Sequence, residues 1–307
     1  MDMAYTEGMD SLSMVLVAAL WGGFFVVGKL AVHDAAPLVT GTWRFLFAAP
    51  FFVMLLLAVR KQERPPTLRD LPVLLGLGAT GIFAYNWLAF EGMRLASAAD
   101  GAMISPTLNP ILTMILAGWL FGETITRSRV LGIAVAILGE LLVFQEALLG
   151  MHAHPERLWG DLYYLGSAFC WSAFTLLGRR ASRSMGPVTV TAYSSLLGAL
   201  MLLAATGPRI LDVPAGDAGL RFWLATAFMA LGGTVLAMVL WNRGLGRLGA
   251  VKAASYTYLV PVFALLMSVF FLHERPGGAQ VLGAGLVLLG VAIANRPTIA
   301  RPLSDPA

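Results

Sequence analysis

Long apolar segments follow one another along almost the whole chain. Separated mostly by short polar connections, ten of them cover residues 12–32, 38–59, 71–92, 96–121, 128–146, 158–178, 187–207, 220–242, 249–272 and 278–295. A helix needs roughly 20 apolar residues to cross the hydrocarbon core of a bilayer. Open strands cannot satisfy their backbone hydrogen bonds in lipid, whereas helices can. The pattern therefore predicts an all-α integral membrane protein with ten transmembrane helices.

The distribution of charge predicts how these helices are oriented. Only 12% of the 307 residues are charged, whereas a soluble domain carries about a quarter. If the N-terminus is cytoplasmic, fourteen of the 21 Lys and Arg residues fall on the inner side, six on the outer side, and Arg44 lies within a span. Loops rich in Lys and Arg stay in the cytoplasm. We therefore expect a multi-pass protein of the bacterial inner (plasma) membrane with both termini cytoplasmic.

The two halves of the chain share a pattern of spacing. Pro110 and Glu123 are thirteen residues apart, and Pro261 and Glu274 repeat this spacing 151 positions later. Glycines downstream keep the same offset: Gly132 with Gly283, and Gly139 with Gly290. A shared spacing with little shared identity indicates one structural unit used twice, in residues 1–147 (spans 1–5) and 148–307 (spans 6–10 and a short cytoplasmic tail). Five spans per unit force the copies into opposite orientations, and inverted repeats around a central cavity are typical of secondary transporters.

These motifs resemble those of the EamA branch of the drug/metabolite transporter (DMT) superfamily. They are the doubled proline helices that end in Gly122-Glu123 and His273-Glu274, the glycine runs after them, and Thr42-Trp43-Arg44-Phe45 in span 2. The resemblance covers about residues 12–295, and His273 departs from it where the family usually has glycine. It implies a central cavity lined by spans 1–4 and 6–9, with spans 5 and 10 peripheral. It also implies export of amino acids, other metabolites or drugs, and the chain looks most similar to exporters of amino acids, including aromatic ones.

Arg44 is the first candidate for substrate binding. It lies about seven residues, or roughly 10 Å, into span 2, where a charge is costly and normally faces a cavity or a partner. Because a guanidinium suits a planar carboxylate, Arg44 could dock the acidic group of a substrate. The alternative is a structural pair with an acidic side chain of the protein.

Four aromatic residues and one amide are further candidates for the cavity. Trp21 and Trp171 occupy equivalent positions near the middle of spans 1 and 6, and repeat symmetry would set them facing each other across the cavity. Each could stack on a substrate ring or cation, or simply pack between helices. Tyr85 and Asn86 of span 3 could bind a zwitterion with an apolar or aromatic side chain. Tyr256 lies in the part of span 9 that echoes the proline region of span 4.

A second set of residues could act as hinges. Pro106, Asn109 and Pro110 lie together in span 4, and Pro261 lies at the equivalent position of span 9. Each proline removes a backbone donor and bends the helix, which leaves carbonyl groups that Asn109 or water can satisfy. Paired hinges near the membrane midplane would allow alternating access, and a static kink is the alternative.

Three other side chains are expected to have structural roles. Trp87 and Trp241 lie toward span ends and are expected in the aromatic belts at the membrane interface. Glu140 lies deep in span 5 and is expected at a contact between helices or subunits. Gly132 and Ala136 nearby are small enough for close helix packing, which would allow a homodimer through the peripheral helices.

Taken together, the sequence predicts a secondary transporter that exports small metabolites by alternating access, foremost amino acids including aromatic and apolar ones. The same fold could instead expel lipophilic cations or drugs, or exchange phosphorylated or nucleotide-linked sugars, which would favour several cationic side chains in the cavity. An intramembrane enzyme or a scaffold is less favoured, because no HExxH or nucleophile-elbow pattern occurs. With a single cysteine and no phosphate-binding glycine loop, no metal site and no cofactor are expected. The expected partners are a small-molecule substrate and the lipid bilayer, not nucleic acid.

Overall fold

The computed structural model describes residues 2–96, 98–121, 126–149, 155–272 and 278–294, and these ranges contain helices and turns but no strand. Some consecutive helices form one continuous rod, interrupted by a turn of π-helix or 3₁₀-helix. In chain order the rods are α1 (Asp2–Asp34); α2 (Pro37–Val59); α3, η1 and α4 (Leu71–Leu77, Gly78–Ala84, Tyr85–Leu95); α5 (Ala98–Phe121); α6 (Arg127–Leu149); α7 (Pro155–Ser182); α8 and η3 (Pro187–Thr206, Gly207–Leu211); α9, η4 and α10 (Gly216–Ala230, Leu231–Leu236, Ala237–Leu248); α11, η5 and α12 (Ala250–Ser255, Tyr256–Tyr258, Leu259–Leu272); and α13 (Gly278–Ala294).

Prolines and glycines set several ends of these rods. Helices α2 and α8 begin at Pro37 and Pro187, because the fixed backbone angle of proline suits the first helical turn. Gly186 and Gly249, directly before α8 and α11, have φ angles of 92° and 82°. Glycine adopts these angles without the steric cost that a side chain would bring, so the chain can reverse within a few residues.

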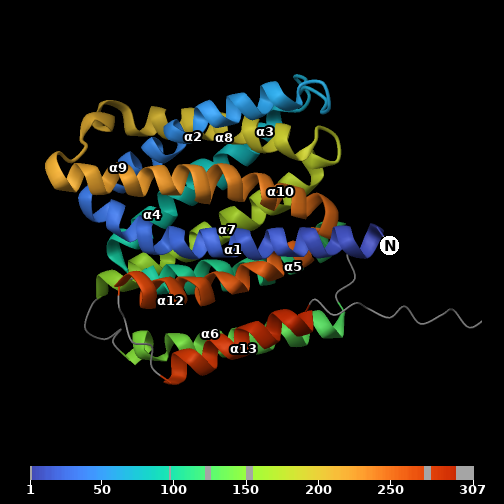
Figure 1. Cartoon of the computed structure of the whole chain (residues 1–307), viewed down its shortest axis with the longest axis vertical. Coiled ribbons are helices and arrows are strands. Elements are labelled where there is room, and N and C mark those ends of the chain that lie inside the picture. The colour runs from blue at the N-terminus through green and yellow to red at the C-terminus, as the bar shows by residue number, and fades with distance from the viewer. Residues whose placement is uncertain (1, 97, 122–125, 150–154, 273–277, 295–307) are drawn as a thin grey trace, which may run out of the picture.

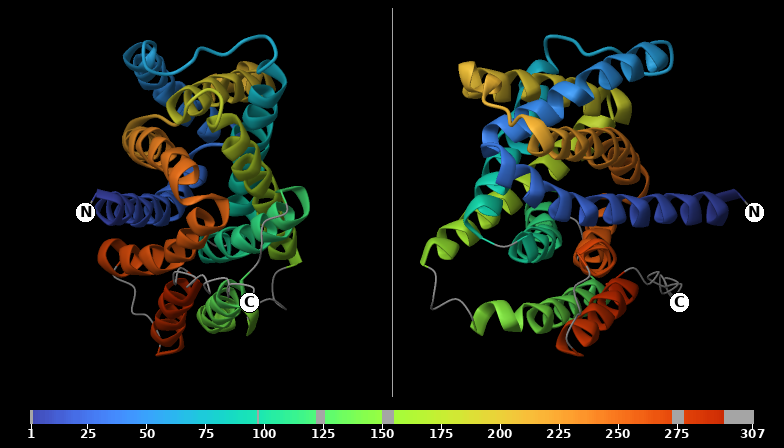
Figure 2. Two further views of the ribbon diagram at one scale, coloured as in Figure 1. Left: turned by 90° about the vertical axis from the view of Figure 1, so that its right-hand side faces the viewer. Right: turned by 60° about the vertical axis from the view of Figure 1, so that its left-hand side comes forward.

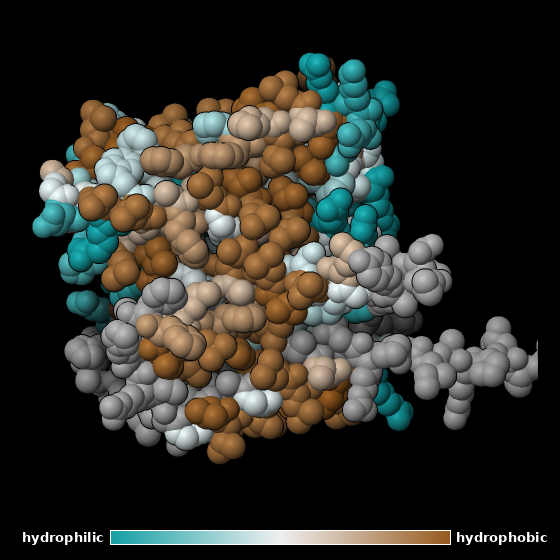
Figure 3. All heavy atoms as spheres, viewed as in Figure 1, coloured by the Kyte–Doolittle hydropathy of each residue, from teal (hydrophilic) through white to brown (hydrophobic). Residues whose placement is uncertain are grey.

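The surface of the bundle carries a broad hydrophobic band. Figure 3 shows this band across the middle of the molecule, with hydrophilic residues gathered at the two sides toward which the helices run. Among the described residues, five helical stretches are long and apolar enough to cross a membrane: Gly8–Asp34, Pro37–Val59, Leu71–Leu95, Pro187–Leu211 and Gly216–Leu248. The helices therefore run across the band, as transmembrane helices would in a bilayer.

Helices from the two halves of the chain pack on one another (Figures 1 and 2). Helix α1 packs along the α9–α10 rod and along α12, while α7 packs along the α3–α4 rod and along α5. Helix α2 packs against α8, and α6 packs against α13. Each contact between the halves thus has a counterpart in which the halves exchange roles, as a pseudo-two-fold axis between repeats would require.

Helices α6 and α13 form a pair at one edge of the bundle (Figure 1). A Cβ atom added to Gly132 would lie 2.4 Å from the backbone nitrogen of Ala294, and one added to Gly290 would lie 2.5 Å from the Gly132 carbonyl oxygen. The repeated glycines therefore allow these two helices to touch. Ala136 lies in the same contact, so the small-residue face that suggested a homodimer is covered within the chain. The homodimer stays a prediction without that support, and the side chain of Glu140 lies outside the described residues.

Ion pairs join α1 to the α9–α10 rod near both of its ends. Arg221 Nε donates to Asp34 Oδ2 at 2.7 Å, where α1 ends and α9 begins. Arg247 Nη1 donates to Asp10 Oδ1 at 3.1 Å, near the other end of α1. The two helices therefore run antiparallel and are held together along their length.

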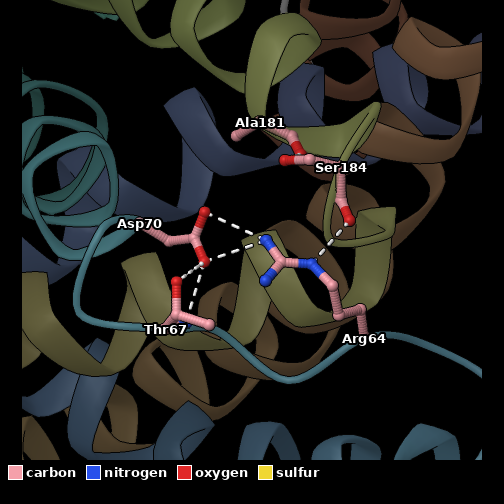
Figure 4. Close-up of polar contacts among 5 residues, drawn as sticks. All are labelled: Arg64, Thr67, Asp70, Ala181 and Ser184. Atoms are coloured by element: carbon pink, nitrogen blue, oxygen red, sulfur yellow. Dashed lines mark hydrogen bonds and ion pairs between the residues drawn. The ribbon is translucent and has the colours of Figure 1, made fainter.

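The connection between α2 and α3 is tied to the turn between α7 and α8 (Figure 4). The Asp70 carboxylate accepts hydrogen bonds from Arg64 Nη2 and from both the backbone N–H and the hydroxyl of Thr67. Arg64 Nε donates to the Ser184 carbonyl oxygen at 3.1 Å. The Glu63 carboxylate accepts hydrogen bonds from the first N–H groups of α8, a favourable place for an anion. These contacts hold four helix ends together on the side of the bundle where α1 begins (Figure 1).

Candidate substrate-binding site

A cavity lies between the two halves of the chain. The part of it that a water-sized sphere can occupy is about 30 Å³, far less than the roughly 300–1,000 Å³ of typical small-molecule sites, so side chains or helices have to move before it can hold an amino-acid-sized ligand. Its described lining comes from α1, α2, η1, α4, α5, α7, η4, α10, η5 and α12, and no described residue of α6 or α13 contributes. The lining includes six of the residues singled out from the sequence: Trp21, Arg44, Tyr85, Asn86, Asn109 and Trp171.

Arg44 brings a buried positive charge to this cavity. Only 5% of the residue is exposed, and its guanidinium donates from Nε to Thr234 Oγ1 at 2.5 Å and from Nη1 to Asn86 Oδ1 at 2.7 Å. Its Cζ atom lies 4.3 Å from the ring centroid of Phe24 and 5.1 Å from that of Phe45. Among the described residues no carboxylate lies within ion-pair distance of it. The expected alternative, a structural pair with an acidic side chain, therefore has no partner in that part of the chain.

Two π-helical turns lie beside this guanidinium. They are η1 and η4, which occupy corresponding places in the third rod of each half, and Gly81 and Gly233 from these turns line the cavity. Such turns are rare and often lie at functional sites. Thr234 belongs to η4, and Asn86 is the second residue of α4, which begins where η1 ends. Arg44 therefore hydrogen-bonds to both halves of the protein at the places where their third rods are irregular.

A cluster of aromatic rings forms another wall of the cavity. The ring centroids of Trp21 and Trp171 are 5.0 Å apart in an edge-to-face arrangement, so these rings touch instead of facing each other across the space. Tyr85 packs on Trp171 at 4.9 Å. Trp241 packs on Trp21 at 5.1 Å and is only 1% exposed. The expectation that Trp241 belongs to an interfacial belt is therefore wrong, since it supports the cluster from inside.

The other tryptophan expected at the interface, Trp87, is on the surface. It is 40% exposed and stacks on Phe83 with ring centroids 6.2 Å apart. It belongs to α4 but, unlike Tyr85 and Asn86, does not line the cavity. Its expected place in an aromatic belt at the membrane interface stays a prediction.

The predicted hinge residues have different surroundings in the two halves. Helix α5 continues unbroken through Pro106 and Pro110, whose side chains lie outside the described residues. Asn109 Oδ1 accepts a hydrogen bond from Ser172 Oγ at 2.9 Å and thus joins α5 to α7. In the second half, the break comes at η5, just before Pro261. The gating role of all four residues stays a prediction.

Tyr256 is the predicted substrate residue that the cavity lining does not include. It is buried in η5 beside Thr257, which does line the cavity. A turn of 3₁₀-helix has three residues per turn, so neighbouring side chains point in different directions. The sequence thus pointed to a segment that lines the cavity, but its lining residue is Thr257, and a role of Tyr256 in substrate binding stays a prediction.

Several lining residues had no distinguishing signal in the sequence. Phe24, Ser105, Met238 and Thr257 are ordinary residues of apolar helices, and each lines the cavity. Thr234, the partner of Arg44, follows the pair Gly232-Gly233. That pair of glycines is the sequence signal that could have predicted an irregular helical turn beside Thr234.

Comparisons with known proteins agree with this architecture. The sequence profile of the EamA-like transporter family matches twice, over residues 10–145 and 158–296. The chain belongs to this family. It is 32% identical to the "Uncharacterized transporter YyaM" of Bacillus subtilis, with 89% of each chain covered. It is 29% identical to the "Probable amino-acid metabolite efflux pump" of Escherichia coli, with 92% of this chain and 94% of that protein covered.

Two more distant similarities extend the comparison. A "Probable terminal-alkyne amino-acid exporter" of Streptantibioticus cattleyicolor is 26% identical over 78% of this chain and 77% of its own length. A solved structure titled "Crystal structure of protein" superimposes with a TM-score of 0.71 at 22% identity and covers 94% of this chain and 96% of its own, which supports the fold alone. Family membership and the apolar helices together make the chain a multi-pass membrane transporter of small molecules, not an enzyme.

Proposed function

We propose that this EamA transporter exports amino acids and closely related metabolites, including aromatic and apolar ones, and that Arg44 binds their carboxylate. The observation that carries the proposal is the buried guanidinium of Arg44 beside a cavity, with neutral acceptors and rings around it. A buried charge without a counter-ion is costly, so a ligand that supplies a carboxylate gains a large part of its affinity there. Relatives whose names include amino-acid export support the same class.

We further propose that the protein crosses the bacterial inner membrane ten times, as two inverted repeats of five helices, with both termini in the cytoplasm. The two matches of one family profile support the duplication. The helix contacts between the halves, each of which has a counterpart with the halves interchanged, support a two-fold arrangement of the copies. Secondary transporters with inverted repeats bind substrate at the repeat interface and expose it alternately to each side. The cavity lies at that interface and fits this mechanism.

The electrostatics of the cavity weigh against the rival cargoes. Arg44 is the one charged residue in the described lining. A lipophilic cation would be repelled by it. A phosphorylated or nucleotide-linked sugar carries more negative charge than a single guanidinium can balance, and sites for such groups usually combine several cationic side chains. An amino acid or its metabolite needs only one such group for its carboxylate.

Counterflow in proteoliposomes tests this proposal. Liposomes that contain the purified full-length protein are loaded with one unlabelled amino acid or amino-acid metabolite and exposed to a trace of the same compound in labelled form, with and without a pH gradient. We expect transient accumulation of label for aromatic and branched aliphatic compounds, and none in liposomes without protein. If no member of the panel accumulates, the proposed cargo class is wrong.

A further inference from the structure

The hydrogen-bonding groups around the cavity differ in whether they already have a partner within the protein. Three acceptors near the space are already used: Asn86 Oδ1 accepts from Arg44, Asn109 Oδ1 accepts from Ser172, and the Gly233 carbonyl accepts from Trp21 Nε1 at 3.1 Å. By contrast, the indole N–H of Trp171 is buried and has no acceptor among the described residues, and Trp171 lines the cavity. Two donors, the Arg44 guanidinium and the Trp171 indole N–H, therefore face a ligand, whereas these three acceptors each already hold a hydrogen bond. The other side-chain acceptors of the described lining are the neutral hydroxyls of Tyr85, Ser105 and Thr257, and none is a carboxylate.

Two carboxylates of α1 near the ends of that helix are too far from the cavity to offset the positive charge of Arg44. Asp10 and Asp34 of α1 are eleven residues before and thirteen residues after Trp21, which places them about 16 and 20 Å along the helix from the cavity. Both are already paired with arginines of the α9–α10 rod. The described lining itself contains one cationic residue and no acidic one.

A zwitterionic amino acid fits this arrangement only in part. Its carboxylate suits Arg44, but its ammonium group is a cation with three hydrogen-bond donors and no acceptor capacity. It would enter a water-poor space that already holds an uncompensated guanidinium, and like charges in such a space repel strongly because the screening is weak. A ligand with acceptors in place of the ammonium would avoid that repulsion and could also accept from Trp171.

We propose that the preferred cargo is a net monoanion: an amino-acid metabolite in which the α-ammonium group is replaced or masked, such as a 2-hydroxy, 2-oxo or N-acyl acid with an apolar side chain. This inference rests on the proposed function and narrows its substrate class. Arg44 binds the carboxylate, and Trp171 Nε1 donates to the group at the α position.

The charge of such a cargo also provides a driving force. A cell interior that is electrically negative repels an anion, and the potential energy of one charge corresponds to a concentration ratio of about 50-fold per 100 mV. A uniporter for a monoanion would therefore export it without a coupled ion. A zwitterion crosses with no net charge and gains nothing from the potential.

Four compounds of nearly equal shape separate the two kinds of cargo. They are phenylalanine (zwitterion), 3-phenyllactate (anion), phenylalaninamide (cation) and 3-phenyllactamide (neutral), and leucine with 2-hydroxy-4-methylpentanoate forms a second matched pair. Binding to purified full-length protein is measured by competition and by thermal shift. We expect phenyllactate to bind at least ~10-fold more tightly than phenylalanine, and the cation not to bind. Equal or tighter binding of phenylalanine would overturn the proposal.

Variants assign the preference to Arg44. Arg44→Gln should remove the advantage of phenyllactate over neutral phenyllactamide, while Arg94→Gln should keep it. Arg94 is a suitable control because it is an exposed arginine paired with Glu91 outside the cavity. An unchanged advantage in Arg44→Gln would contradict the proposal. If Arg44→Gln does not fold, the order of the four compounds on the unmodified protein decides the matter alone.

Flux under an imposed membrane potential completes the test. Proteoliposomes with a potassium diffusion potential are loaded with labelled phenyllactate or phenylalanine. A negative interior should speed phenyllactate efflux and a positive interior should slow it, with phenylalanine flux unaffected by either. If only phenylalanine is transported, or if phenyllactate flux does not depend on the membrane potential, the monoanion proposal is wrong while the proposed function still holds. If no compound of the counterflow panel moves, the proposed function fails instead.

Discussion

The hydroxyl of Thr234 is the residue-scale feature that most directly holds the buried charge in place. It accepts from Arg44 Nε at 2.5 Å in a fully buried setting. Thr234→Val keeps the shape of the side chain but leaves that N–H without its acceptor, and a hydrogen bond to a charged group contributes about 1.5–3 kcal/mol. We expect Thr234→Val to destabilise the protein by about that amount, measured by thermal or SDS-induced unfolding in detergent.

Thr226 provides the matched control for that substitution. It is equally buried in α9, but its hydroxyl has no partner among the described residues. Thr226→Val removes an unpaired polar group from an apolar setting, which costs nothing and can stabilise. Equal destabilisation by the two variants would mean that the bond to Arg44 contributes no more than generic packing.

Asp70 makes a pH-dependent contribution at the surface. Hydrogen bonds from the backbone and hydroxyl of Thr67, with a smaller effect of the Arg64 guanidinium, lower the pKa of its carboxyl group from the usual value. A lowered folded-state pKa means that the contribution is complete above the ordinary pKa of an aspartate and is lost as the pH falls through the lowered one. Asp70→Asn should therefore loosen the connection between α2 and α3 at neutral pH, as acid would in the unmodified protein.

Limited proteolysis measures this effect. Trypsin at neutral pH should cleave Asp70→Asn after Arg60 or Lys61 several-fold faster than the unmodified protein, because access depends on opening of the loop. Asp217→Asn is the control, since Asp217 is an exposed acid in the first turn of α9 at the other side of the bundle. No difference between these two variants would show that Asp70 does not hold the connection.

At the scale of helices, close contact between α6 and α13 depends on glycine. A Cβ atom at Gly290 would lie 2.5 Å from a backbone oxygen and 2.6 Å from a backbone nitrogen of α6, and backbone atoms cannot move aside as a flexible side chain can. Gly290→Ala should separate the helices and destabilise the protein by about 1–3 kcal/mol, the usual cost of overpacking. Gly285→Ala in the same helix meets nothing within 4 Å and should be neutral or stabilising, as alanine favours helix. Unfolding of the two variants is measured side by side, and equal stability of Gly290→Ala and Gly285→Ala would contradict the prediction.

Helices could be predicted from this sequence better than the faces that they present. The expected segment 38–59 corresponds to α2 at Pro37–Val59, and 128–146 to α6 at Arg127–Leu149, because apolar length and charged ends are local properties. The π-helical turns η1 and η4 were not predicted, since an apolar run rich in glycine reads the same with either hydrogen-bond pattern. Trp241 was misplaced for a related reason: in a uniformly apolar helix, hydrophobicity does not distinguish lipid from protein interior.

The candidate site was easier to predict where a residue is unusual for its surroundings. Arg44 stood out because a charge inside a span is costly, and Trp21 and Trp171 stood out because the duplication pairs them. All three line the cavity, although their role in binding stays a prediction. Thr234 and Thr257 are common in membrane helices, so only the three-dimensional arrangement reveals them.

At the scale of the whole molecule, the contacts divide six rods into two groups around the cavity. The first group is α1, the α9–α10 rod and α12, and the second is α7, the α3–α4 rod and α5. Arg44, from α2, donates to Thr234 of the first group and to Asn86 of the second. If access alternates as proposed, each group should move as a unit, and ligand binding at Arg44 would act on the bond that spans them.

Cross-linking within and between these groups tests that division. In a Cys170→Ser background, Asp34→Cys with Arg221→Cys joins two members of the first group at their existing ion pair. Gly28→Cys with Met93→Cys joins the two groups, since a Cβ atom at Gly28 lies 3.2 Å from the Met93 sulfur. With a short, cleavable bifunctional reagent, we expect the first cross-link to leave counterflow largely intact. The second should stop it until the linker is cleaved, because rocking of one unit against the other is how repeats of this kind alternate access. The opposite result would assign α1 and the α9–α10 rod to parts that move relative to each other, and uncross-linked double variants measured in parallel give the reference rate.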